Sequence, residues 1–194
     1  MVGCSPFSHL GQVTPGESLS DVFPSWIRLS YDGFVYRPYD MNMPRSIPRR
    51  PPSEIAVDPP LTEHGAVVSQ LTGKVIRLAG IQPIAVISAP EHRCVQTAAA
   101  IVKALDSLCY IYVENGLQSW TQMTCSPLNA LFPRDLSQLG LPIFEGYQPL
   151  LHHKEIPPSE SLTAFCDRIL FVNKHLVQKL EGLVLFLCLI YFHF

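Results

Sequence analysis

With 194 residues the chain is long enough for one domain, and a hydrophobic share of 47% provides material for a sizeable core. Charged residues make up 15% of the chain, a composition that argues against general disorder. The net charge of −2 excludes a broad basic surface for nucleic acid, so we expect an anionic ligand to be held by a local cluster of cations.

The six cysteines are scattered and form no C-x-x-C pair, so their spacing fits neither a zinc site nor a compact disulfide framework. We expect reduced, mostly buried thiols, as in cytoplasmic proteins. The first residues show no basic region followed by an apolar core, and therefore no secretory signal. These patterns predict a cytoplasmic domain without a metal or cofactor.

Residues 1–60 are rich in proline and short polar residues, and we interpret them as an irregular N-terminal part of the domain. Prolines recur throughout 37–60, where each fixes φ and removes a backbone donor. We expect this stretch to be an extended, loop-like run on the surface. Residues 61–194 then form the α/β core, with a C-terminal end that we expect to be incomplete.

Regular structure is predicted from residue 61 onward. Thr62 is a suitable N-cap for a helix that ends near Gly80, and a second helix is expected over residues 91–108. Residues 84–87 and 110–113 are β-branched or aromatic runs typical of buried parallel strands. This alternation predicts an α/β layered fold with a mostly parallel sheet. The apolar residues at helical spacing are Val67, Val68, Leu71, Val75 and Leu78, then Val95, Ala98, Ala99, Val102 and Leu105.

The C-terminal third is expected to be irregular over residues 123–160. Ser159 or Ser161 then caps a predicted amphipathic helix that Gly182 ends. The apolar tail, residues 183–192, has three interpretations: a final strand of the sheet, an artefactual or alternative terminus, or a membrane anchor. The strand is favoured, because the tail is about half as long as the roughly 20 apolar residues that a spanning helix needs.

The segment from Ser88 to Ala98, SAPEHRCVQTA, carries the strongest functional signal. It follows a predicted strand and opens a helix, where open α/β sheets bind ligands and where helix N–H groups favour an anion. Arg93, in the first helical turn, can donate two parallel hydrogen bonds to phosphate oxygens. His92 can face the same anion. We therefore predict that Arg93 and His92 bind a phosphate or phosphorylated substrate.

The same segment resembles the S-x-P-x-x-R-x-x-Q-T-A signature of the histidine phosphatase superfamily, the phosphoglycerate-mutase-like proteins. Three further motifs, NMPRSIP at 42–48, PLTEHG at 60–65 and GL with WT at 116–121, narrow the resemblance. Together they resemble the phosphatase domain of the ubiquitin-associated and SH3 domain-containing proteins, which suppress T-cell-receptor signalling. The resemblance spans about residues 16–182. It implies a three-layer α/β/α sandwich, a phosphorylated substrate or protein partner, and a homodimer.

The resemblance also implies a set of catalytic parts. A histidine in an R-H-G motif attacks phosphorus, a second histidine helps to hold the phosphoryl group, two or three arginines neutralise its oxygens, and a carboxylic acid protonates the leaving group. Arg93 matches one of the arginines. Thr14 and Pro15 stand in front of Gly16, where the R-H-G arginine and nucleophilic histidine belong, and Ser18 stands where a further arginine is expected.

The acid and the second histidine are also replaced. The acid belongs in a G-L-x-E-W pattern, where this chain has Ser119, and Cys188 stands where the second histidine is expected. His9 lies near the missing nucleophile but lacks its arginine and spacing, so a solvated terminal histidine is the simpler interpretation. Glu114 lies near the missing acid, but we expect this strand-end carboxylate to face solvent.

The remaining histidines fit the site less well. His193 is too distant in sequence to replace the second histidine easily. His64 is expected at the surface, and for His92 too a surface position is the simpler interpretation. His152 and His153 have no carboxylate or cysteine spaced to hold a metal with them.

Three functions remain open from the sequence. The first is a non-catalytic phosphatase-like module that binds phosphate or a phosphorylated partner. The second is an active phosphatase with His9 or His92 as a displaced nucleophile, and the third is an interaction fragment tethered to a membrane by the apolar tail. We favour the first, because loss of a nucleophile costs enzymes of the triad type about 10⁶ in rate.

Overall fold

The computed structural model describes residues 10–106, 108–120, 128–179 and 184–187. Its central sheet has the strand order β1 (Leu10–Val13), β6 (Val184–Leu187), β4 (Ala85–Ser88) and β5 (Ile111–Val113). All three neighbouring pairs in this sheet are parallel. The predicted parallel sheet is confirmed, and residues 184–187 of the apolar tail form its strand β6.

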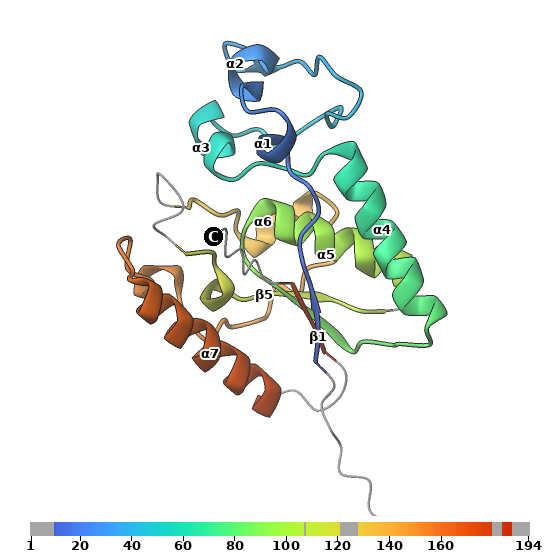
Figure 1. Cartoon of the computed structure of the whole chain (residues 1–194), viewed down its shortest axis with the longest axis vertical. Helices are drawn as coiled ribbons and strands as arrows, with labels where there is room; N and C mark the ends of the chain where they lie inside the picture. Colours follow the sequence, from blue (N-terminus) through green and yellow to red (C-terminus); the bar gives the residue numbers. More distant parts are fainter. Residues whose placement is uncertain (1–9, 107, 121–127, 180–183, 188–194) are drawn as a thin grey trace, which may run out of the picture.

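The sheet separates two layers of helices. Ala85 and Ile87 of β4 pack with α7 (Leu162–Lys179), whereas Val86 between them packs with α5 (His92–Leu105). Successive side chains of a strand point to opposite faces, so α7 and α5 cover opposite faces of the sheet. Figure 1 shows α7 on one side and α5 with α4 (Glu63–Leu78) on the other. The three-layer α/β/α sandwich is confirmed.

Helix α4 begins as predicted, because the Thr62 hydroxyl oxygen accepts a hydrogen bond from the backbone N–H of Gly65 at 2.9 Å. Its buried residues, however, are the small Gly65, Ser69 and Gly73. A Cβ on Gly73 would lie 2.6 Å from the carbonyl oxygen of Ile101, so α4 and α5 pack at a distance that only glycine permits. The apolar stripe whose spacing predicted the helix is exposed: Val67, Val68, Leu71, Val75 and Leu78.

The N-terminal part of the chain contains more regular structure than its prolines indicate. Three short helices, α1 (Leu19–Val22), α2 (Trp26–Ser30) and α3 (Pro52–Val57), gather at one end of the molecule with the hairpin β2 (Tyr31–Asp32) and β3 (Val35–Tyr36) (Figure 1). They enclose a small core of their own, formed by Leu19, Trp26, Met43 and Ile55. The expectation of an extended surface run over residues 37–60 is therefore wrong for α3 and for Met43.

A second helix was missed in the same way. Within the stretch expected to be irregular lie α6 (Pro133–Gln138) and the 3₁₀ turn η3 (His153–Glu155). Both α3 and α6 have proline in their first turn, where a missing N–H costs no hydrogen bond and a fixed φ suits the helix. Proline thus begins these helices and does not exclude them. The boundary between residues 60 and 61 stays a prediction.

The C-terminal elements agree with their sequence patterns. Phe165, Ile169, Val172 and Leu176 of α7 are buried against the sheet, as their spacing indicates. Strand β6 lies between β1 and β4, with partners on both sides. None of the helices in the described part of the chain is long and apolar enough to cross a membrane. Residues 188–192 of the apolar tail lie outside the described residues.

Candidate anion site at the start of α5

Arg93 lies at the carboxyl edge of the sheet, as predicted. Strand β4 ends at Ser88 and α5 begins at His92, so Arg93 belongs to the first turn of the helix. Its side chain is 25% exposed, and its guanidinium Nη1 lies 4.0 Å from a carboxylate oxygen of Asp21 in α1. The guanidinium is therefore partly open to solvent, at a helix N-terminus that favours an anion.

The other polar residues of the signature hold the site together. The Thr97 hydroxyl accepts a hydrogen bond from the backbone N–H of Gly16 at 3.0 Å and donates one to the carbonyl oxygen of Arg93 at 2.8 Å. The Gln96 amide oxygen accepts from the backbone N–H of Leu61 at 2.7 Å. Two loops, one after β1 and one before α4, are thereby fastened to the first two turns of α5.

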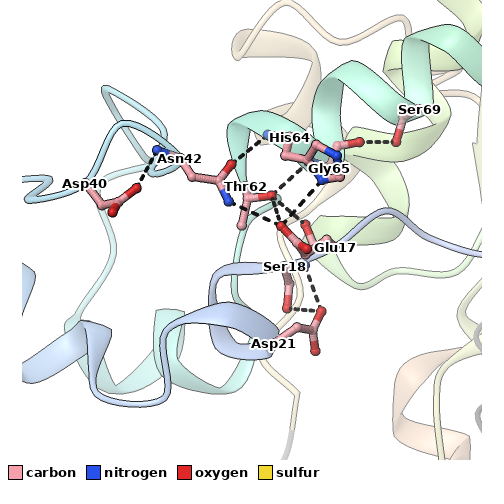
Figure 2. A network of polar contacts seen from close by, with 9 residues as sticks. All are labelled: Glu17, Ser18, Asp21, Asp40, Asn42, Thr62, His64, Gly65 and Ser69. Atoms are coloured by element: carbon pink, nitrogen blue, oxygen red, sulfur yellow. Dashed lines mark hydrogen bonds and ion pairs between the residues drawn. The ribbon is translucent and has the colours of Figure 1, made fainter.

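Glu17 connects the same two loops to a third (Figure 2). Its carboxylate oxygen Oε1 accepts hydrogen bonds from the Thr62 hydroxyl at 2.7 Å and from the Asn42 amide at 3.3 Å. The Asn42 amide oxygen in turn accepts from the backbone N–H of His64 at 2.8 Å. The NMPRSIP and PLTEHG motifs therefore meet beside Gly16 and Glu17, which explains why they occur together with the Arg93 signature.

The loop after β1 has no basic side chain among its described residues near Arg93. Thr14 and Pro15 precede Gly16, and Ser18 is fully buried. The backbone N–H and the hydroxyl of Ser18 both donate to Asp21, at 2.7 and 2.8 Å. Where the resemblance expects an arginine, the chain has a serine that caps α1.

His92 is buried beside Arg93 and not at the surface. His92 is 3% exposed, and its backbone N–H donates to a carboxylate oxygen of Asp58 at 2.7 Å. Burial, with a smaller effect of the Arg50 charge, lowers the pKa of His92 to about 4, so the imidazole is neutral at pH 7. A neutral, buried ring adds no positive charge for an anion. The burial of His92 therefore does not support its predicted role as a ligand, which stays a prediction.

The partner of His92 belongs to a buried ion pair that the sequence analysis missed. Arg50 donates to Asp58 at 2.9 Å, and their side chains are 7% and 1% exposed. Burial raises the pKa of Asp58 to about 6, although the hydrogen bonds from His92 and Arg50 act in the opposite direction. Arg50 comes from the proline-rich run whose helix was missed, so no local pattern indicated this contact.

Ser119, at the position of the expected acid, lies in the loop after β5. Its backbone N–H donates to a carboxylate oxygen of Glu91 at 2.7 Å, while its hydroxyl oxygen is buried and has no hydrogen-bond partner among the described residues. Glu91 is 7% exposed. The carboxylate next to residue 119 is thus supplied by Glu91, from the segment that precedes α5, and a contact between residues 28 positions apart leaves no sequence signal.

Glu114 does not face solvent, contrary to expectation. It is fully buried, and its carboxylate accepts hydrogen bonds from the Tyr147 hydroxyl and the backbone N–H of Leu150, both at 2.7 Å, and from Gly116 at 2.9 Å. Burial and the hydrogen bond to Glu114 raise the pKa of Tyr147. Glu114 is fully engaged in holding the loops that follow β5, so it is a poor substitute for the missing acid.

The loop that carries Ser119 is also clamped from α7. Arg168 forms a buried ion pair with Glu160 at 2.7 Å and donates to the carbonyl oxygens of Gly116 and Gln118 at 2.8 and 2.9 Å. The Trp120 indole N–H donates to the carbonyl oxygen of Glu160 at 2.7 Å. This rim of the site is therefore rigidly supported, with Ser119 at the position where the resemblance expects the acid.

The remaining candidates are not assembled at the site. His64 is largely exposed, and its ring nitrogen lies 3.8 Å from the Glu17 carboxylate. His152 and His153 are exposed, and no cluster of histidine, cysteine or acidic residues among the described residues could hold a metal. His9, Cys188 and His193 lie outside the described residues.

Comparison with known proteins places this site in a family. The family model of the histidine phosphatase superfamily (branch 1) matches residues 52–188, which is more than half of the chain. The chain belongs to the histidine phosphatase superfamily. This agrees with the Arg93 signature, the three-layer fold and the loops that Gln96 and Thr97 fasten.

The relatives narrow the group. The chain is 33% identical over 165 residues to ubiquitin-associated and SH3 domain-containing protein A of Mus musculus, covering 80% of the chain and 26% of that protein. It is 29% identical over 178 residues to the ecdysteroid-phosphate phosphatase of Drosophila melanogaster, covering 88% and 24%. The chain therefore spans about a quarter of the length of these curated relatives.

A solved structure shows the same fold. The ecdysone phosphate phosphatase of Bombix mori, in complex with tungstate, superposes with a TM-score of 0.84 and 24% identity. The match covers 92% of this chain and 71% of the Bombix mori chain.

Proposed function

We propose that this domain binds a phosphomonoester or a phosphorylated protein through Arg93 and has little or no phosphatase turnover. The observation that carries the proposal is the partly exposed guanidinium at the N-terminus of α5, held there by the complete signature scaffold. Tungstate, a tetrahedral oxyanion like phosphate, is bound by the Bombix mori relative, which supports an oxyanion as the ligand. In this proposal Arg93 contacts the anion and the buried His92 supports the first helical turn.

The proposed loss of turnover rests on residue types at described positions. Phosphoryl transfer through a phosphohistidine needs a positioned nucleophile and a proton donor for the leaving group. Pro15 stands where the nucleophile is expected and cannot attack phosphorus, and Ser119 is a far weaker proton donor than a carboxylic acid. Ser18 also removes one positive charge that would neutralise the phosphoryl oxygens.

The proposal also includes the cellular compartment and the partner of the domain. We place its action in the cytoplasm, with a phosphorylated protein as partner, because a relative named above is a ubiquitin-associated and SH3 domain-containing protein. A homodimer stays a prediction of the family resemblance.

A binding measurement tests the role of Arg93. We expect inorganic phosphate, titrated into the ¹⁵N-labelled domain and followed by NMR, to shift amide signals in the first turn of α5. Arg93→Gln should weaken this binding about tenfold or more, because it removes a charge-assisted pair of hydrogen bonds.

The matched control is Arg77→Gln. Like Arg93, Arg77 is an arginine loosely paired with an aspartate, Asp106, at 3.9 Å, but it lies at the far end of α4 and is 50% exposed. This variant loses the same charge and should keep phosphate affinity within about twofold of the wild type. Its partner Asp106 is the C-cap of α5, about 20 Å along the helix from Arg93, which is more than a Debye length. Equal phosphate affinity in the wild type and Arg93→Gln would contradict the proposed site.

A further inference from the structure

Arg93 has a fixed negative neighbour, Asp21. One carboxylate oxygen of Asp21 lies 4.0 Å from the Arg93 guanidinium, and the two side chains are 52% and 25% exposed. The pair is loose and partly solvated, so it holds Arg93 weakly. An anion can therefore reach the guanidinium without first breaking a strong ion pair.

The Asp21 carboxylate keeps its orientation because Ser18 binds its other oxygen. The backbone N–H and the hydroxyl of Ser18 donate to Oδ2 at 2.7 and 2.8 Å, and Figure 2 shows both contacts. With Oδ2 engaged, Oδ1 is the oxygen that faces Arg93. Asp21 is thus a built part of the site rather than a mobile surface acid.

A negative charge in this position affects ligands according to their own charge. Coulomb repulsion from one carboxylate is twice as large for a doubly charged anion as for a singly charged one at the same place. Phosphate monoesters have a second pKa of about 6 and carry two charges at pH 8. Sulfate monoesters have the same tetrahedral oxyanion and carry one.

We propose that Asp21 is a specificity-determining residue that biases the Arg93 site toward singly charged tetrahedral oxyanions and against doubly charged ones. This inference rests on the proposed function, because it requires Arg93 to hold the anion. It adds a ligand class: a sulfate ester, a phosphodiester or a singly protonated phosphate monoester binds with less opposition from Asp21 than a phosphate monoester dianion does.

The test compares phenyl phosphate with phenyl sulfate at pH 8 and low salt. In Asp21→Asn the amide oxygen can still accept from Ser18, so the cap of α1 is retained while the charge is lost. We expect the affinity for phenyl phosphate to rise about tenfold and that for phenyl sulfate about threefold, by isothermal titration. Asp21→Ser provides a second neutral variant should Asp21→Asn fold poorly.

Asp106→Asn is the matched control, because Asp106 is the exposed partner of Arg77 at 3.9 Å. It should change neither affinity. If both ligands gain equally or not at all in the Asp21 variants, while Arg93→Gln still weakens binding about tenfold or more, the specificity inference is wrong and the proposed anion site stands. If neither ligand binds the wild type or the Asp21 variants, both the inference and the proposed function are overturned.

Discussion

The buried pair of His92 and Asp58 shows how the environment of single residues shapes the site. Asp58 holds the backbone N–H of His92 and the guanidinium of Arg50, and so fixes the first turn of α5 from inside the protein. The backbone of His92 takes part in this support, and its predicted role as an anion ligand stays a prediction. Arg93, its neighbour, is the residue that remains partly exposed.

The lowered pKa of His92 makes stability depend on pH. A histidine with a pKa of about 6.5 when unfolded and about 4 when folded binds more protons in the unfolded state between these values. The contribution of His92 is therefore fully present above pH 6.5 and is lost as the pH falls through 4. Asp58 titrates in the same range with the opposite sign, because its pKa is raised to about 6.

Comparison of the wild type with His92→Leu isolates the contribution of the His92 side chain to the pH dependence of stability. The backbone N–H that binds Asp58 is kept in this variant, so the contribution of Asp58 cancels in the difference. We expect the stability of the wild type relative to His92→Leu to fall by roughly 2–3 kcal/mol between pH 7 and pH 4, measured by urea unfolding. A difference that does not change with pH would show that the ring is solvated in the folded protein.

Among the secondary-structure elements, those with a clear hydrophobic pattern were predicted correctly. The pattern of α7 predicted both the helix and its buried face, and the β-branched run before Ser88 predicted a buried strand. Helix α4 was predicted, but its buried face follows from glycine and serine, which carry no hydrophobic signal. Helices α3 and α6 were missed because their first-turn prolines were interpreted as loop signals.

The clamp from α7 to the Ser119 loop is a contact between elements that determines stability. Arg168→Met would leave the Glu160 charge buried and two carbonyl oxygens without their donor. We expect a loss of about 3–5 kcal/mol in the free energy of unfolding, measured in urea. Arg168→Met combined with Glu160→Gln should recover part of this loss, because the uncompensated charge is removed.

Arg77→Met is the control for the clamp, since Arg77 is exposed and its ion pair is worth little. It should change the free energy of unfolding by no more than about 0.5 kcal/mol. Similar losses in Arg168→Met and Arg77→Met would mean that the Arg168 network does not hold the loop.

At the scale of the whole molecule, the sequence was sufficient for the family and the layered fold. The motifs around Asn42, Thr62 and Gln96 indicated the family from the sequence, and the structure shows that they meet around Glu17 and Gly16. The motifs could not predict tertiary contacts between residues far apart in the chain, such as Glu91 with Ser119 and Asp21 with Arg93. These contacts depend on tertiary packing and have no local pattern.

In the proposed function, the molecule combines a hydrogen-bonded scaffold around Arg93 with the loss of turnover. The loops that carry Gly16, Leu61 and Gly116 are fastened by hydrogen bonds of Thr97, Gln96 and Arg168. Glu17 joins the first two of these loops. Pro15 stands where the resemblance expects the histidine that attacks phosphorus, and Ser119 stands where it expects the acid that protonates the leaving group. Binding and turnover are separable properties of such a domain, and the account predicts the first without the second.

The most direct measurement of this central claim is phosphohistidine trapping with a ³²P-labelled aryl phosphate, performed on the wild type, His9→Ala, His92→Ala and Arg93→Gln at a phosphate ester concentration that saturates binding. We expect no covalent label on any of the four proteins and no release of phosphate above the uncatalysed rate. Label on the wild type that is lost in His9→Ala or His92→Ala would contradict the account and identify the nucleophile of an active phosphatase.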